Sequence, residues 1–376
     1  MQGIEMKKSK ILHFAPAYQN RGGGIYEVVE NLSEAQCVNG KSSVDILVLE
    51  TFVGTHPINK NIYNLLPSKF NQYKLMFQVL NFLFRRAKSY DIIHIHGAWS
   101  VQFLLVFPFL YLNRKKIVYQ PHGLLSPDTI KKNWYIKKIA WLFYQQFFIR
   151  FSKLIICCSE RERSDLRSYP LARGKLTIIP NGIDQTFFDE SSNLAPRKKR
   201  FLYVSQITPI KNLESLFHAI KILNKHESCN IHLDIYGYGP DSYINELKRL
   251  ATSLSIADNV FFKGGLAREH RVPIYDSYEY FILPSLSENF GIAVLEALSR
   301  GCKVLVSKRT PWKDYKHPAL TLFEPDQHSI CIAVKSALAS AKLSPVTETK
   351  PEFDLDSFRW ENIALEFFNA YFNKKR

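Results

Sequence analysis

Short apolar runs alternate with longer amphipathic stretches along the whole chain. Because the runs are continuously apolar rather than alternating, they are typical of strands buried on both faces of a parallel sheet. In the first half the predicted strands are 11–14, 44–49, 92–96, 117–120, 154–158 and 177–179. Helical periodicity predicts helices over 26–36, 74–88, 135–151 and 160–168. Strand–helix repetition of this kind predicts helices on both faces of the sheet.

The second half repeats this pattern after a polar segment without periodicity, residues 190–200, which we interpret as a linker. Its predicted strands are 201–204, 232–236, 260–262, 280–283 and 304–306. Its predicted helices are 213–224, 243–254, 292–299 and 329–341. The fold class is therefore α/β, with two doubly wound, Rossmann-like parallel sheets facing a central cleft. We place one domain at 1–190, with the terminal helix 357–376 packing back on it, and the other at 191–356.

Composition agrees with two ordinary globular domains. The chain has 376 residues, of which 46% are hydrophobic and 22% charged, so it can bury large cores. Its six cysteines are scattered and form no CxxC pair, which argues against a disulfide framework and favours a reducing compartment. No signal-peptide pattern follows Met1, and the longest apolar run, 101–112, is too short to cross a bilayer. We therefore expect a cytoplasmic protein.

The charge balance predicts an anionic partner. Lysine and arginine number 50 against 34 aspartate and glutamate residues, a net charge of +16. Basic and aromatic residues interleave over 69–88 and 131–141. This pattern suits an interfacial helix facing an anionic membrane surface, and it equally suits an amphipathic helix that packs its aromatic side chains inward. Nucleic acid is not expected, because the basic residues are spread and no nucleic-acid motif is present.

The most informative segment is 284–301, where a predicted strand is followed by a polar loop and a helix that begins near Gly291. A glycine there lets backbone N–H groups approach an anion, which the helix dipole also attracts, so the segment predicts a phosphate cradle with Asn289 and Phe290. Glu288 and Glu296 are separated by about 12 Å if the intervening chain is helical. Such carboxylates cannot share a proton, but they can accept hydrogen bonds from hydroxyls at two ends of an extended ligand.

Other candidate residues also follow predicted strands. Gly23 and Gly24, after Arg21, form a backbone-donor turn before a helix. Lys211 follows the first strand of the second half and could stabilise charge on a leaving group. His122 ends a first-half strand and could donate to a sugar hydroxyl or a phosphate; His94 is interpreted as structural, and His96 is left unassigned. Residues 354–356 form a DxD pattern, which we interpret as helix capping by Asp356 or Ser357 rather than as a metal site.

Together these residues resemble the retaining glycosyltransferases of family 4, which have the GT-B fold. The matching segments occur in family order: 22–24, 121–123, 179–184, Lys211, 234–240 (with Gly237), 262–264 and 288–296. Within the family, 121–123 and 310–312 look like enzymes of bacterial capsule, O-antigen or exopolysaccharide synthesis.

The resemblance implies transfer of a sugar from a nucleotide donor, UDP- or GDP-linked, to a glycan or polyprenyl-diphosphate-linked acceptor. No cofactor and no metal are expected, and a peripheral position on the inner face of the cell membrane is. Glu296 would bind the ribose, Lys211 the diphosphate and the Phe290 and Gly291 amides the distal phosphate. Glu288 and His122 would contact the transferred sugar, so His122, Lys211 and Glu288 are the catalytic candidates.

Two departures from the family pattern keep alternatives open. Gln206 stands where the family commonly has an arginine, and 301–303 lacks the usual Gly-x-Pro. Gln206 leaves open a non-catalytic basic subunit that supports a partner transferase at the membrane. A nucleotide-sugar epimerase or phosphorylase on the same scaffold is a third interpretation.

Overall fold

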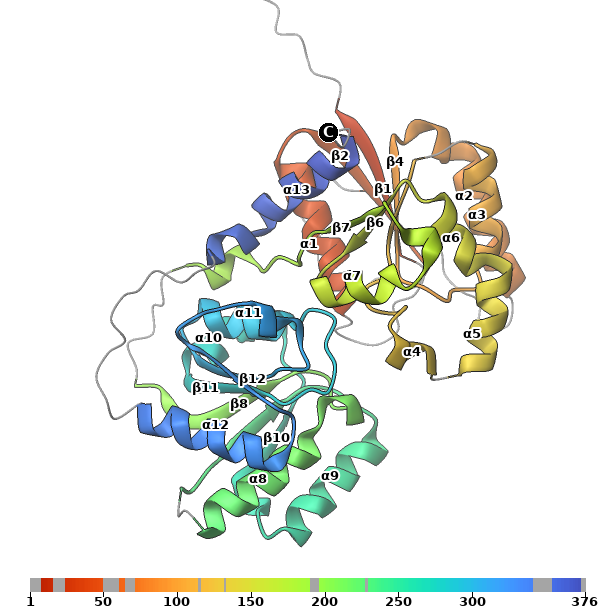
Figure 1. Cartoon of the computed structure of the whole chain (residues 1–376). Coiled ribbons are helices and arrows are strands. Elements are labelled where there is room, and N and C mark those ends of the chain that lie inside the picture. The colour runs from red at the N-terminus through yellow and green to blue at the C-terminus, as the bar shows by residue number, and fades with distance from the viewer. Residues whose placement is uncertain are drawn as a thin grey trace, which may run out of the picture. The chain divides into compact units, whose positions relative to one another are not determined.

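The computed structural model describes residues 8–15, 24–49, 61–64, 72–113, 116–131, 133–189, 196–226, 229–340 and 354–372. The chain divides into two compact units, Met1–Gly182 with Phe358–Arg376, and Ile183–Ser357 (Figure 1). The division falls before the linker from which the sequence placed it. The reason lies in the segment 183–189, which is bonded within the second unit: Asp184 pairs with Arg268, and Arg300 Nη1 donates to the Phe187 and Asp189 carbonyls.

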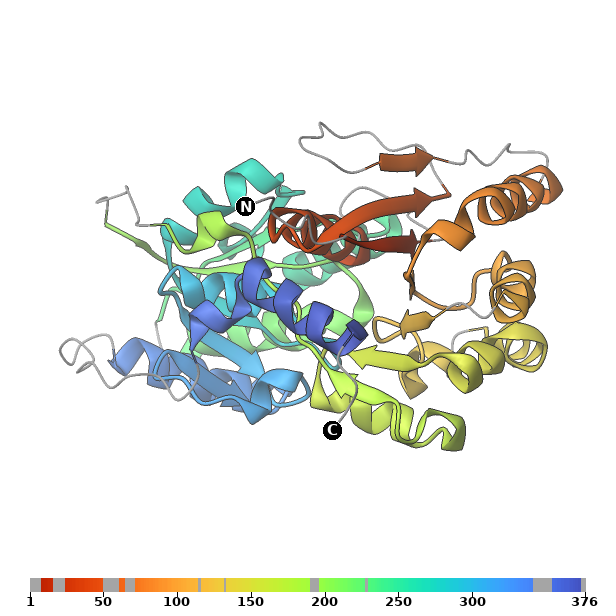
Figure 2. The same cartoon turned by 90° about the horizontal axis from the view of Figure 1, so that it is seen from above.

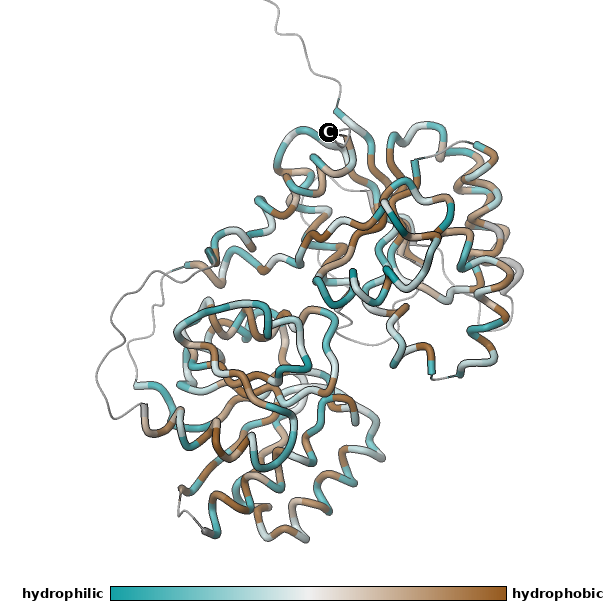
Figure 3. Tube along the Cα trace, viewed as in Figure 1, coloured by the Kyte–Doolittle hydropathy of each residue, from teal (hydrophilic) through white to brown (hydrophobic). Residues whose placement is uncertain are grey.

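The first unit is built on a seven-stranded sheet of order β3-β2-β1-β4-β5-β6-β7, and its strand pairings are parallel. The strands are β1 Ser9–Ala15, β2 Ser42–Val48, β3 Asn61–Asn64, β4 Ile92–His96, β5 Ile117–Gln120, β6 Leu154–Cys157 and β7 Leu176–Ile178. Figure 3 shows these strands mainly in brown, in keeping with continuously apolar runs.

Helices cover both faces of this sheet. They are α1 Gly24–Val38, α2 Gln72–Arg86, α3 Phe103–Leu112, α4 Pro127–Lys131, α5 Trp134–Ala140, α6 Gln146–Phe151, α7 Glu160–Arg167 and α13 Trp360–Phe372. The larger core gathers α2, α3 and α6 on one face, around Phe103 and Phe148. On the other face α1 packs with the terminal helix α13 (Figure 1, Figure 2). The last helix of the sequence is therefore part of the first unit.

The second unit has a six-stranded parallel sheet of order β10-β9-β8-β11-β12-β13. Its strands are β8 Lys198–Val204, β9 Leu233–Tyr236, β10 Val260–Gly264, β11 Tyr278–Leu283, β12 Lys303–Ser307 and β13 Leu320–Phe323. Its helices are α8 Leu213–His226, α9 Asp241–Ser253, α10 Arg268–Asp276, α11 Ile292–Ser299 and α12 Gln327–Ser340. The predicted class of two parallel α/β sheets is confirmed.

Each sheet has a topological switch point, where chain order reverses direction across the sheet. It lies between β1 and β4 in the first unit and between β8 and β11 in the second. In open parallel sheets, ligands bind beyond the carboxyl ends of the strands at this point, because the two connections diverge there. The loops that follow these four strands are therefore the first place to look for a site.

Four elements lie outside the sequence prediction. Strands β3 and β13 are short and partly exposed edge strands, and α10 contains Pro273 within a largely polar sequence. The apolar run 101–112 contains α3, which tolerates Pro108. Among the residues that the structure describes, no helix is both long and apolar enough to span a bilayer.

The terminal helix offers a test of the first unit's packing. Phe367 in α13 is 1% exposed and lies against His94, with ring centroids 5.8 Å apart. Phe367→Ala should lower the free energy of unfolding by about 3–5 kcal/mol, because it leaves a cavity. Leu365, in the same helix, is 40% exposed, and Leu365→Ala should cost only about 0.5 kcal/mol. Urea denaturation of both variants measures the difference, and equal losses would contradict this packing.

Candidate functional site

Backbone and side-chain hydrogen bonds join the two loops at the switch point of the second unit. The Leu286 N–H donates to the Ile210 carbonyl at 2.9 Å. The Asn212 amide donates to the carbonyls of Pro284 (3.2 Å) and Pro325 (2.8 Å). Asn212 has a φ of +57°, a left-handed conformation that asparagine tolerates better than most residues. The loops after β8 and β11 are thus held in a fixed register.

The predicted catalytic pair Lys211 and Glu288 meets across these loops. Lys211 Nζ lies 2.5 Å from Glu288 Oε1, which also accepts a hydrogen bond from Ser285 Oγ at 2.8 Å. The two side chains are only 12% and 10% exposed. A shielded ion pair of this kind is strongly coupled, because removing one partner leaves the other charge buried and uncompensated. The arrangement fixes a cation and a carboxylate at one strand edge.

Helix α11 begins directly beside this pair, as the sequence predicts. Gly291 has a φ of +83° and precedes the first helical residue. Trp312 Nε1 donates to the Phe290 carbonyl at 2.7 Å and would lie 3.2 Å from a Cβ at Gly291. The turn from half-buried Asn289 into the helix is therefore pinned by an indole. The first N–H groups of a helix have no intrahelical acceptor, which makes this end suited to an anion.

Glu296 lies within α11 and is held by two side chains that sequence reasoning missed. Arg271 Nη1 lies 3.0 Å from Glu296 Oε1, and the Tyr275 hydroxyl donates to Oε2 at 2.7 Å. Burial, together with the neighbouring carboxylate, raises the pKa of Tyr275, so its hydroxyl keeps the proton that it donates. Both partners come from α10, whose sequence carries no recognisable motif. A ribose at Glu296 would have to share the carboxylate with Arg271 and Tyr275.

The glycines after β9 allow one loop to approach another closely. A Cβ at Gly237 would lie 1.8 Å from the Ser205 carbonyl oxygen, and one at Gly239 would lie 2.0 Å from that of Ile207. The Gly237 N–H already donates to the Gly264 carbonyl at 2.7 Å, so in this structure Gly237 shapes the loop. Gln206 lies in the same loop, exposed at its side chain, and its carbonyl accepts from the Tyr203 hydroxyl.

In the first unit, His122 sits on a strained turn at the end of β5. Its φ is +54°, and Gly123 follows with +75°. The Glu162 carboxylate holds this turn by accepting from the N–H groups of Gly123 (2.5 Å) and Cys158 (2.8 Å). Burial raises the pKa of Glu162 and lowers that of His122 to about 3. His122 is therefore a neutral ring in a clamped position, and Glu162 is a supporting residue that sequence reasoning missed.

The remaining predicted residues are distributed as follows. Gly24 is the exposed first residue of α1, whereas Gly23 lies outside the described residues. Near the end of the second unit, Asp354 Oδ1 accepts from the Asp356 N–H at 3.0 Å. The capping contact is thus made by Asp354, not by Asp356 or Ser357, because its side chain is the one that reaches the turn's free N–H.

Two parallel α/β sheets with their loops gathered at switch points are the architecture of GT-B glycosyltransferases. Sucrose-phosphate synthase from Thermosynechococcus elongatus superposes with a TM-score of 0.75 at 18% identity, covering 97% of this chain and 98% of that one. Anabaena Alr3699/HepE, in complex with UDP and glucose, gives a TM-score of 0.74 at 17% identity, covering 97% and 100%. These likenesses show the fold.

Sequence comparison shows the family. Residues 184–343 match the family described as glycosyl transferases group 1, and residues 22–187 match glycosyltransferase family 4. The chain belongs to these glycosyltransferases. A relative over nearly the whole length is the GDP-mannose:cellobiosyl-diphosphopolyprenol alpha-mannosyltransferase of Komagataeibacter xylinus, 24% identical over 96% of this chain and 92% of that one.

The glycine loop generates a prediction that separates steric clash from backbone strain. Gly239→Ala places a Cβ 2.0 Å from backbone, so the loops must separate, whereas a Cβ at Gly264 meets no atom within 4 Å and suffers only from its φ of +77°. We expect Gly264→Ala to cost about 1–2 kcal/mol of stability. Gly239→Ala should cost more and also weaken nucleotide binding. Urea denaturation and nucleotide titration of both variants measure this, and a larger loss for Gly264→Ala would refute the close approach.

Proposed function

We propose that this glycosyltransferase is a retaining enzyme that moves a sugar from a nucleotide-sugar to a glycan or lipid-linked acceptor in bacterial capsule, O-antigen or exopolysaccharide synthesis. The observation that carries the proposal is the shielded Lys211–Glu288 pair beside the amino end of α11. A cation, a helix N-terminus and a carboxylate on adjoining loops can together bind a diphosphate and an attached sugar.

On the donor side, each residue has a role that its surroundings support. Lys211 neutralises the diphosphate as the bond to the sugar breaks, and the Phe290 and Gly291 amides receive the distal phosphate. Glu288, already oriented by Ser285, accepts hydrogen bonds from the transferred sugar. Glu296 binds the ribose, with Arg271 and Tyr275 fixing its rotamer.

On this proposal the reaction needs no metal and no cofactor. Lys211 and the helix N-terminus supply the positive potential that a divalent cation would otherwise give to the leaving group. The departing phosphate then takes the proton of the acceptor hydroxyl on the same face of the sugar, which retains the anomeric configuration. Gln206, exposed in the loop after β8, adds no charge to this set.

The relatives guide the choice of donor and acceptor. The Komagataeibacter xylinus relative is named for GDP-mannose and a cellobiosyl-diphosphopolyprenol, and the Anabaena structure holds UDP and glucose. We therefore propose a UDP- or GDP-linked sugar as donor and a polyprenyl-diphosphate-linked glycan as acceptor.

The donor assignment is tested with a thermal-shift panel of UDP, GDP, ADP and CMP, followed by turnover of the matching sugar nucleotide. One nucleotide far above its Kd should stabilise the native chain by a few kcal/mol, about 3. Lys211→Met and Glu288→Gln should each lower turnover about 10²–10³-fold, because they remove charge from the reacting end of the donor. Lys221→Met, an exposed lysine of α8, is the matched control and should leave turnover unchanged.

The outcomes separate the alternatives. A folded protein that binds no nucleotide in the panel would favour a non-catalytic subunit, in which Gln206 marks a lost donor site. Turnover that survives in Lys211→Met and Glu288→Gln would place the chemistry elsewhere on the scaffold.

A second part of the proposal concerns a surface of the first unit. Six side chains of α5 and the turn after it are more than half exposed although they are large and apolar: Trp134, Tyr135, Ile136, Ile139, Leu142 and Phe143. An apolar surface of this kind marks an interaction site. Lys138 lies over the Trp134 ring, and Lys131 is largely exposed. This composition fits an anionic membrane surface rather than nucleic acid, and it would bring the enzyme to lipid-linked acceptors at the inner face of the cell membrane.

Liposome sedimentation tests this surface. Leu142→Ser combined with Phe143→Ser should weaken binding to anionic liposomes about a hundredfold, because two large apolar side chains no longer insert. Ile332→Ser, at an exposed apolar residue of α12 in the second unit, is the matched control and should bind like the native chain. Binding should also fall as salt rises. Equal binding by all three proteins would exclude this surface as the contact.

A further inference from the structure

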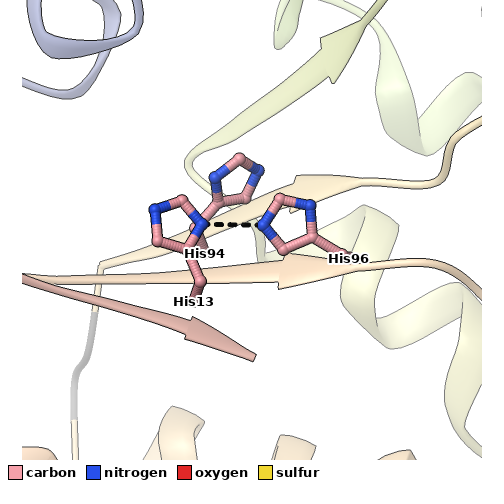
Figure 4. A group of neighbouring side chains, drawn as sticks. All are labelled: His13, His94 and His96. Atoms are coloured by element: carbon pink, nitrogen blue, oxygen red, sulfur yellow. Dashed lines mark hydrogen bonds between the residues drawn. The ribbon is translucent and has the colours of Figure 1, made fainter. Parts of the chain in front are cut away.

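A row of buried polar side chains crosses the first unit between its sheet and helices α1 and α13. His13 on β1 and His94 and His96 on β4 are 0%, 0% and 1% exposed and point toward one another (Figure 4). Hydrogen bonds extend the row at both ends, to Gln36 of α1 and to His122. The row therefore ends at a residue that the proposed function assigns to the transferred sugar.

The contacts form one continuous chain. Gln36 Oε1 lies 2.8 Å from His13 Nε2, His13 Nδ1 lies 2.8 Å from His96 Nε2, and His96 Nδ1 lies 2.9 Å from His122 Nε2. The ring planes of successive histidines differ by only 26° and 24°, with centroids 5.1 and 5.2 Å apart. Near-coplanar rings meeting edge to edge have the geometry of N–H···N hydrogen bonds.

The chemistry at Gln36 sets the direction of every proton in this chain. A carbonyl oxygen only accepts, so His13 Nε2 carries a proton and donates it to Gln36 Oε1. In a neutral ring His13 Nδ1 is then an acceptor, so His96 Nε2 donates to it. By the same step His96 Nδ1 accepts, and His122 Nε2 is the donor.

Two further observations support this direction. The Gln36 amide nitrogen faces the Tyr371 hydroxyl at 3.5 Å, and that hydroxyl lies 2.7 Å from His94 Nδ1. A hydroxyl that accepts from Gln36 donates to His94, which places the proton of His94 on Nε2. All four rings then adopt the Nε2–H tautomer that the histidine side chain favours in water. Burial keeps the rings neutral, since it holds the pKa of His94 and of His96 well below the usual value.

We propose that Gln36, His13 and His96 are positioning residues that hold His122 as the neutral Nε2–H tautomer, so that Nδ1 presents a lone pair to the ligand. His122 is 8% exposed, in contrast to the sealed rings behind it. A lone pair accepts a hydrogen bond from a hydroxyl and repels an anionic oxygen. The inference rests on the proposed function and sharpens it: His122 contacts a hydroxyl of the sugar and does not donate to a phosphate.

The same three histidines also place ring nitrogens within 4.8 Å of one another, as a transition-metal site would require. Within the described part of the chain, His94 Nε2 is buried without a hydrogen-bond partner. However, His13 Nδ1 and His96 Nε2 are closer than two ligands of a tetrahedral metal, and they already share a proton. The geometry favours the hydrogen-bonded row, and a bound metal becomes an outcome of the test.

The test reads the tautomer directly, by two-dimensional long-range ¹H–¹⁵N NMR of the histidine-labelled full chain at neutral pH. The spectrum of His122→Gln identifies the His122 signals. We expect a protonated Nε2 and an unprotonated Nδ1 in the native protein. His96→Asn keeps an oxygen acceptor near the place of Nδ1 and should preserve this tautomer, whereas His96→Leu and Gln36→Met should give a mixture. Circular dichroism establishes that each variant is folded.

Activity gives a second readout. His96→Leu should lower kcat for sugar transfer several-fold more than it raises KM for the acceptor, and His96→Asn should restore it. A native His122 protonated on Nδ1, or variants that leave its tautomer unchanged, would overturn the proposal. Stoichiometric metal by elemental analysis, with loss of the His13 and His96 ring protons, would overturn it too. The NMR measurement needs no nucleotide or acceptor, so its result stands apart from any failure of the proposed function.

Discussion

Parallel pairing of strands that are distant in sequence is the constraint on which both candidate regions depend. β8 pairs with β11, and β1 with β4, so that loops far apart along the chain follow neighbouring strands. In the second unit this pairing brings Lys211 to Glu288, 77 residues later. A cation placed there by an antiparallel hairpin would face one connection only. The parallel arrangement leaves two diverging connections, and the space between them is where a diphosphate can be met from two sides.

Around these loops, precision comes from hydrogen bonds rather than from regular structure. The Asn212 amide, the Trp312 indole and the Glu162 carboxylate each tie a loop carbonyl or N–H that lies outside the sheet ladders. Each is itself buried, so its own polar atoms would be costly if the contact were lost. Loops held in this way need less reorganisation when a ligand develops charge, which is the property that electrostatic catalysis uses.

The sequence predicted those features that are encoded locally, and failed where the cause lies in distant contacts. The continuously apolar strands and the strand–loop–helix around Gly291 carry their own pattern, which is why both sheets and the position of α11 were predicted. α10 has no such pattern: Pro273 and a polar composition hide a helix that supplies Arg271 and Tyr275. The edge strands β3 and β13 are too short to stand out from loops. The domain boundary was placed too late because the pairing of Asp184 with Arg268 cannot be read from a linker's composition.

The buried histidines show most clearly why a site cannot be read from local pattern alone. His94 and His96 alternate with Ile93 and Ile95 along β4, so they lie on the opposite sheet face from the larger core. A polar sheet face would be costly if a helix covered it with apolar groups. The cost is met by Tyr371, which reaches His94 from the end of the chain, 277 residues away. The return of α13 onto the first unit therefore does more than cover apolar surface: it provides the hydroxyl that gives a direction to the hydrogen bonds beneath it.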